Sequence, residues 1–226
     1  VLDIVSDMYL NPTLPQVEID KEKGVIIEEI NMYEDLPQRK VQDVFGALLY
    51  GDQPAGRTVL GLKENIKRFS REDFVKYRDE HYVAEATTVI VAGNFNETKI
   101  LDSIKKIFKE APVNKKVEKE KIHEEQTKPE ISLFKKDTDQ AHLVLGFRTF
   151  DLYDKRNRIM QVLLGVLDAG MSSRLFKKLR DEMGVCYYVS AYHDTLTDHG
   201  VLQVNAGVDM KRIREVVVVI LDELRK

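Results

Sequence analysis

The spacing of apolar and polar residues over the first 111 positions predicts four helices and one strand. In residues 15–33 apolar side chains recur at helical spacing and fall on one side. The sequence S-R-E-D at residues 70–73 resembles a capping box, which marks a helix start. Residues 87–92, T-T-V-I-V-A, form a β-branched run typical of a buried strand. The predicted elements are helices over residues 15–33, 41–50, 70–82 and 97–109, and a strand over residues 87–92.

The composition changes between residues 112 and 130, where lysine and glutamate predominate. This stretch has few apolar residues to bury, so we interpret it as a solvated linker. After it the apolar pattern starts again and ends in a helix from about residue 210. The predicted elements are strands over residues 131–135 and 141–147, helices over 155–167 and 172–182, and strands over 186–192 and 201–208 joined by a turn near 198–200.

Two blocks of strands and helices separated by a charged linker predict an α+β fold of two domains. The first covers residues 1–111, the linker 112–130 and the second 131–226. Apolar residues recur at helical spacing from Val1 onward, and the last helix still continues at Lys226. We therefore expect a fragment in which both domains are incomplete. Removal of a tag or leader is the alternative explanation for the N-terminus.

Composition narrows the classes of partner and compartment. Charged residues make up 32% of the chain with both signs mixed, and the formal net charge is -3. This balance gives no reason to expect nucleic acid or an anionic membrane as partner. No apolar run approaches the length that spans a bilayer. The single cysteine, Cys186, allows no internal disulfide and favours a reducing compartment, which we expect to be cytoplasmic, with an organelle matrix as the alternative.

Histidine pairs with the spacing of a zinc site are absent from the sequence. None of the five histidines lies in H-x-x-E-H or H-E-x-x-H, the spacings that place two imidazoles on one helical face. We expect each to be a surface or structural histidine, and Cys186 to be a buried, unreactive thiol. The chain also lacks a P-loop and a G-x-G-x-x-G motif. The histidines are His81, His123, His142, His193 and His199.

Two carboxylates in the predicted helix over residues 15–33 form the first pattern that could belong to a functional site. Glu22 and Glu29 are seven residues apart, or two helical turns, so both project from nearly the same face. They can be the charged face of an amphipathic helix. The apolar run between them instead predicts a mostly buried helix, in which a carboxylate needs a cation or a hydrogen-bond partner.

The second pattern covers residues 170–188, G-M-S-S-R-L-F-K-K-L-R-D-E-M-G-V-C-Y-Y. A loop of small residues leads into a short basic helix, Gly184 ends the helix, and an aromatic strand follows. Taken alone, this pattern is ordinary helix capping followed by a strand of core aromatics.

Both patterns resemble sequences of the pitrilysin-type zinc peptidases, the family of the mitochondrial processing peptidase. E-K-G-V-I-I-E-E at residues 22–29 resembles the helix that carries the family's distal metal ligand, and residues 51–61 resemble the stretch after it. Residues 170–188 resemble the second-domain signature, closest to the processing-peptidase branch. His81-Tyr82 followed by T-T-V-I-V-A-G-N matches the beginning of a family strand.

The resemblance implies a zinc endopeptidase of two related α+β domains per half, which closes around an unfolded peptide. In this family the histidines of an H-x-x-E-H helix and one later glutamate hold Zn2+, and the glutamate inside the motif activates water. By alignment Glu29 is the later ligand. Glu22 corresponds to a family glutamate that orients the ligands without binding the metal itself. Arg180 and Tyr187 match the residues that hold the substrate backbone and help to stabilise the tetrahedral intermediate, with Tyr188 kept as a neighbouring alternative. Residues 1–111 would belong to the metal-site domain and residues 131–226 to the substrate-binding domain.

The chain departs from the family pattern because no H-x-x-E-H helix precedes Glu29. One carboxylate does not hold zinc well and no base remains to activate water, so we expect this chain alone to be inactive. The leading hypothesis is an intact parent that hydrolyses extended peptides with one Zn2+ per active site. The alternative is a non-catalytic subunit that binds peptide or pairs with an active homologue, and a plain structural α+β module is the third. Implied partners are an extended peptide and a second copy or homologous subunit.

Overall fold

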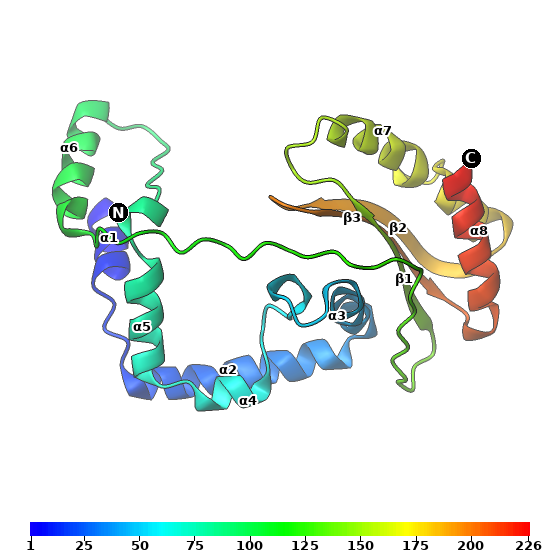
Figure 1. The fold of residues 1–226 in the computed structure, drawn as a ribbon, viewed down its shortest axis with the longest axis horizontal. Coiled ribbons are helices and arrows are strands. Elements are labelled where there is room, and N and C mark those ends of the chain that lie inside the picture. The colour runs from blue at the N-terminus through cyan, green and yellow to red at the C-terminus, as the bar shows by residue number, and fades with distance from the viewer. The chain divides into compact units, whose positions relative to one another are not determined.

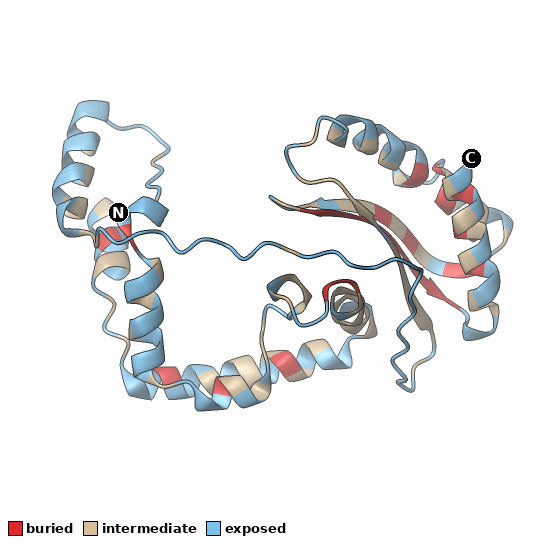
Figure 2. Ribbon diagram, in the orientation of Figure 1, coloured by how far each residue is buried: buried red, intermediate tan, exposed pale blue.

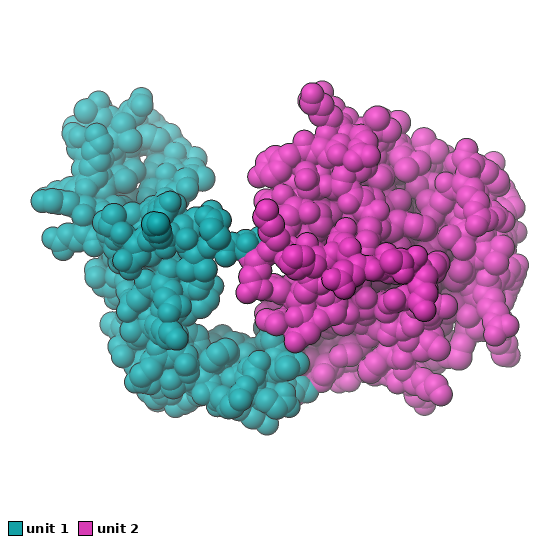
Figure 3. Space-filling model, in the orientation of Figure 1, with its two compact units in different colours: residues 1–29, 60–119 teal, residues 30–59, 120–226 magenta.

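The computed structural model describes residues 1–226 and shows an α+β fold, with helices and a small antiparallel sheet (Figure 1). The chain divides into two compact units, coloured separately in Figure 3. The first unit holds residues 1–29 and 60–119, and the second holds residues 30–59 and 120–226. The sequence-based division into domains at residues 1–111 and 131–226 stays a prediction.

The first unit is built from helices. A capping box opens α5: the Ser70 hydroxyl accepts the amide of Asp73, and the Asp73 carboxylate accepts the amide of Ser70 at 2.8 Å. The helices of this unit are α1 (Leu2–Leu10), α2 (Gln16–Asp35), whose last residues belong to the second unit, α4 (Lys63–Arg68), α5 (Arg71–His81) and α6 (Glu97–Ile107). The helices predicted over residues 15–33, 70–82 and 97–109 are confirmed by α2, α5 and α6.

The prediction of a strand over residues 87–92 is wrong. After a 3-10 turn at Ala84–Ala86 the chain runs on without strand pairing, and Ile90 is 84% exposed. A strand needs a neighbour to satisfy its amides and carbonyls, and the first unit contains no other strand. The strand predicted over residues 131–135 is wrong for the same reason, since no chain segment pairs with it.

The second unit contains the sheet, in the order β1-β3-β2 with both pairings antiparallel. A tight connection between β2 and β3, closed by the amide of Leu196 on the carbonyl of His199, confirms the predicted turn. The remaining predicted helices and strands are also present. The elements are α3 (Pro37–Tyr50), β1 (Ala141–Thr149), α7 (Asn157–Asp168), a π-helix (Phe176–Glu182), β2 (Cys186–Thr195), β3 (Gly200–Val208) and α8 (Ile213–Arg225).

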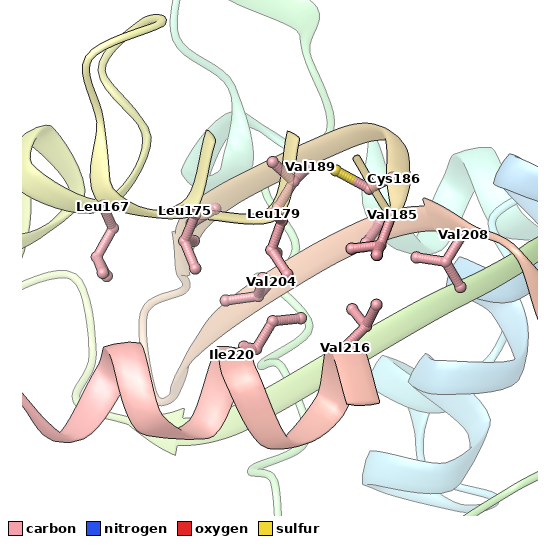
Figure 4. Close-up of a cluster of buried hydrophobic side chains, with 12 residues drawn as sticks. Leu167, Leu175, Leu179, Val185, Cys186, Val189, Val204, Val208, Val216 and Ile220 are labelled. Atoms are coloured by element: carbon pink, nitrogen blue, oxygen red, sulfur yellow. The ribbon is translucent and has the colours of Figure 1, made fainter. Parts of the chain in front are cut away.

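Strand alternation gives the sheet one apolar and one polar face. The apolar face packs against α7, α8 and the π-helix and forms the main core (Figures 2 and 4). On the polar face, the Phe45 ring of α3 packs directly over Gly146. A Cβ at Gly146 would lie 2.2 Å from this ring, so no larger residue fits there without a shift of the ring. Gln42 of α3 donates a 2.7 Å hydrogen bond to Asn205 of β3. Buried core residues include Leu167, Leu175, Leu179, Val185, Val204, Val208, Val216 and Ile220.

The charged segment over residues 112–130 has no helix or strand and is mostly exposed, but some of its residues also make hydrogen bonds within the second unit. The Gln53 side chain donates to the carbonyl of His123 at 3.0 Å and accepts its amide at 2.7 Å. Arg148 of β1 donates to the Glu124 carboxylate at 2.8 Å. These contacts connect residues 123–124 to Gln53 and to β1, through the backbone of His123 and the side chain of Glu124.

Candidate functional site

The two candidate metal carboxylates lie on α2 in the first unit. Glu22 is exposed and Glu29 is partly buried, and neither carboxylate makes a hydrogen bond or ion pair. The prediction that the helix between them is mostly buried is wrong, since Val25 is 59% exposed. The spacing of two turns still places both carboxylates on nearly one face. Neither carboxylate is occupied by a protein partner, but no further metal-binding side chains surround them.

Zinc in a catalytic site requires about three protein ligands and an open position. No group of three or more histidine, cysteine, aspartate or glutamate residues in the structure is arranged to hold a metal ion. Glu29 supplies an unpaired carboxylate, which suits one ligand position. The residues present therefore do not form a complete zinc site.

Arg180 lies on the π-helix that joins the Gly170 loop to β2. The helix has the i to i-5 hydrogen bond of a π-turn, from the amide of Met183 to the carbonyl of Lys178 at 3.2 Å. Gly184 ends it with a φ of +60°, a conformation that glycine adopts without strain. The fully buried Leu179 anchors the helix, so the neighbouring Arg180 is left on its exposed side.

Tyr187 occupies a β-bulge at the start of β2. Cys186 pairs with Val208 and Tyr188 pairs with Gly207, so Tyr187 is the extra residue between two consecutive partners on β3. The bulge shifts the strand alternation by one position. Both Cys186 and Val189 can thus reach the core, while Tyr187 is expelled from it and is 61% exposed.

The structure brings Arg180 and Tyr187 together. Nη1 of Arg180 donates to the carbonyl of Tyr187 and, at 3.4 Å, to that of Cys186, so the guanidinium holds the backbone of the bulge. The Tyr187 hydroxyl has no protein partner. The pair therefore offers a free phenol and further guanidinium N–H groups, which are donors suited to a carbonyl oxygen that gains negative charge.

Tyr188, the neighbouring alternative, is placed differently. Its hydroxyl lies 3.0 Å from Nδ1 of His142, and burial raises the pKa of its phenol. It is therefore engaged within the sheet. No sequence motif indicates this contact, although Gly207, between Ala206 and Val208 inside β3, is a signal of close approach by another group.

Four of the five histidine side chains contact other side chains of the fold, and His123 is exposed. His193 lies 2.7 Å from the Thr149 hydroxyl, His199 lies 2.7 Å from Asp198, and His81 stacks on Tyr77. Cys186 is buried, and burial raises the pKa of its thiol. None of the helices is long and apolar enough to cross a bilayer.

Comparison with protein-family models gives two matches that together cover most of the chain. Residues 1–63 match the model described as "Insulinase (Peptidase family M16)", and residues 68–226 match "Peptidase M16 inactive domain". The uncharacterized zinc protease YmxG of Bacillus subtilis is 34% identical over 217 residues, which is 95% of this chain and 52% of that protein. The uncharacterized zinc protease SCO5738 of Streptomyces coelicolor is 30% identical over 229 residues, covering 99% and 50%. The chain spans about half the length of the curated relatives it matches.

Solved structures with the same fold include several proteases. A peptidase M16 inactive domain from Pseudomonas fluorescens has a TM-score of 0.87 at 17% identity, covering all of this chain and 56% of that one. A protease from Helicobacter pylori has a TM-score of 0.86 at 20% identity, covering 99% and 56%. A chain of Complex III2 from Candida albicans has a TM-score of 0.70 at 16% identity, covering 84% and 47%. At these identities the likeness establishes the fold.

Proposed function

Because the chain belongs to the M16 peptidase family, we propose that its full-length parent is a zinc-dependent endopeptidase that hydrolyses extended peptides. Zinc is the metal named for the relatives of about 30% identity. Glu29 is proposed as one zinc ligand and Glu22 as the carboxylate that supports it. The remaining ligands and the base that activates water would lie outside these 226 residues. When bound, zinc would polarise the scissile carbonyl as a Lewis acid.

The observation that carries this proposal is the unpaired phenol of Tyr187 on a bulge held by Arg180. Bulges are common next to active sites, where they direct a side chain out of the strand pattern. We propose that Tyr187 donates a hydrogen bond to the substrate carbonyl as its oxygen becomes negative. Arg180 would keep the phenol in place through the bulge carbonyls and offer its free N–H groups to the peptide backbone.

Extended conformation is the proposed requirement on the substrate. Strand β2 is an edge of the sheet, and an edge strand presents main-chain groups that pair with an added peptide strand. Such pairing selects conformation more than side-chain sequence. A second copy or a homologous half is the proposed assembly partner, consistent with a structural neighbour that is a chain of a larger complex.

Kinetics of the full-length parent with an extended fluorogenic peptide test the proposal. Tyr187→Phe removes only the hydroxyl and is expected to lower kcat roughly 100-fold, the size typical for loss of one such donor. Tyr153→Phe is the matched control, since Tyr153 is 75% exposed and away from the bulge, and it should retain full activity. Equal kinetics for both variants would contradict the role of Tyr187. A parent that binds the peptide but never cleaves it would favour the non-catalytic subunit instead.

A further inference from the structure

Three residues form a row across all three strands of the sheet, directly beside the bulge. Gly207 of the central strand pairs with His142 of β1 on one side and with Tyr188 of β2 on the other. All three lie on the polar face, opposite the main core. The row therefore links the two outer strands through the residue that follows Tyr187.

Gly207 gives Tyr188 its path across the central strand. A Cβ at Gly207 would lie 2.4 Å from Cε1 and 2.7 Å from Cδ1 of the Tyr188 ring, so any larger residue would displace the ring. Over this glycine Tyr188 reaches His142, with its hydroxyl 3.0 Å from Nδ1 and the two rings stacked at 5.9 Å with an angle of 27°. The contact needs a side chain of tyrosine length, because it spans two strand spacings.

The bulge is thereby held on both sides of Tyr187. On one side Cys186 is buried in the core. On the other side Tyr188 is fixed by its ring packing and its bond to His142. Arg180 adds a contact to the bulge carbonyls. Tyr187, whose hydroxyl has no hydrogen-bond partner, is in this way given a defined backbone, which limits the directions that its phenol can take.

We propose that Tyr188, Gly207 and His142 form a cross-sheet lock that fixes the β-bulge and so positions the phenol of Tyr187 for substrate. The three are positioning residues, since they act through Tyr187 and do not touch the peptide. Their role in catalysis depends on the proposed function, whereas the lock itself does not. Burial lowers the pKa of His142 and raises that of Tyr188, and both shifts favour a hydrogen bond between two neutral side chains.

Fluorine NMR of the 226-residue chain labelled with 3-fluorotyrosine tests the lock. The Tyr187 resonance is assigned by its disappearance in Tyr187→Phe. Tyr188→Phe keeps the ring and removes only the hydroxyl that bonds His142, so the Tyr187 resonance should shift or broaden. Gly207→Ala, which drives the ring away, should change it further. An unchanged Tyr187 resonance in Tyr188→Phe would overturn the proposal. This variant adds no atom to the sheet, so it is expected to fold even if Gly207→Ala does not.

Gly146→Ala is the matched control for general damage to the sheet. It is the same substitution on the same face, but its Cβ would meet the Phe45 ring at 2.2 Å and not Tyr188. It should lower the melting temperature while leaving the Tyr187 resonance in place. If Gly146→Ala moves that resonance as much as Gly207→Ala does, the lock is not specific and the proposal fails.

Double variants test whether the lock acts through the named residues. In a Tyr188→Ala background no ring remains to clash, so adding Gly207→Ala should leave the Tyr187 resonance where Tyr188→Ala puts it. A further shift of the same size as in the wild type would overturn the proposal. In the parent, Tyr188→Phe should lower kcat/KM about tenfold alone and have no effect when added to Tyr187→Phe. An inactive parent would remove the proposed function but leave the NMR result to decide the lock.

Discussion

Leu179 is the residue that ties the π-helix to the core, and Leu179→Ala tests that connection. Its side chain is fully buried and lies in the same cluster as Leu175, Val204 and Ile220 (Figure 4). Arg180 is the next residue in the chain. We therefore expect the packing of Leu179 to hold the segment that carries Arg180 against the sheet.

The size of the effect follows from the atoms removed. Leu179→Ala deletes three carbon atoms, worth about 2.4 kcal/mol at roughly 0.8 kcal/mol per buried methylene. The cavity left behind adds to this loss, and buried Leu→Ala substitutions cost about 2–5 kcal/mol in total. A loss of about 2.4 kcal/mol corresponds to a roughly 50-fold decrease in the protection of core amides.

Hydrogen exchange measured by mass spectrometry is the suitable assay, because it reports each unit separately. Peptides that cover β3 should lose at least about 50-fold protection in Leu179→Ala. Peptides from α5 lie in the first unit and should be unchanged, which gives an internal reference. Lys177→Ala changes an exposed residue of the same π-helix and should have little effect. A loss of less than about fivefold across β3 would refute the packing described for Leu179.

Three further predictions address individual contacts. Ser70→Ala removes the N-cap of α5 and should reduce protection of its first amides about fivefold, equivalent to the ~1 kcal/mol typical of a cap, whereas Ser103→Ala at an exposed site on α6 should not. The pKa of Glu223 is held below its ordinary value of 4.5, first by Lys226 and then by Arg174. The ionised Glu223 carboxylate therefore contributes its full stabilisation above pH 4.5, and this stabilisation is lost as the pH falls through the lower pKa of the folded state. In that pH range the melting temperature of Glu223→Gln should depend less on pH than that of the wild type. Cys186 should react with a thiol reagent slowly in the native chain and rapidly in urea, and equal rates in both states would contradict its burial.

The helices could be predicted from the sequence because their determinants are local. The capping box at Ser70 and Asp73 and the terminating Gly184 both occur where the pattern placed them. Strands depend on partners that are often far away in the sequence, as β1 and β3 are here. Residues 87–92 have the composition of a strand and still do not pair, because the first unit offers no neighbouring strand. Composition gives the capacity to pair, and the presence of a neighbour decides whether pairing occurs.

The candidate site was only partly accessible to sequence reasoning. The spacing of Glu22 and Glu29 gave their common helical face, but the exposure of Val25 between them could not be read from an apolar run. The proximity of Arg180 and Tyr187 depends on a π-turn and a bulge, each of which inserts a residue and shifts the periodicity. The contact of Tyr188 with His142 joins residues 46 positions apart and follows from strand register, which a single sequence does not specify.

Zinc content of the full-length parent decides whether Glu29 is a metal ligand. The metal bound per chain would be titrated for the wild type, for Glu29→Gln, and for Glu28→Gln, whose carboxylate is exposed on the adjacent position of α2. We expect one zinc per intact active site in the wild type and in Glu28→Gln, with binding at least about 100-fold weaker and peptide cleavage lost in Glu29→Gln. Equal zinc occupancy and equal activity in Glu29→Gln and Glu28→Gln would contradict this expectation.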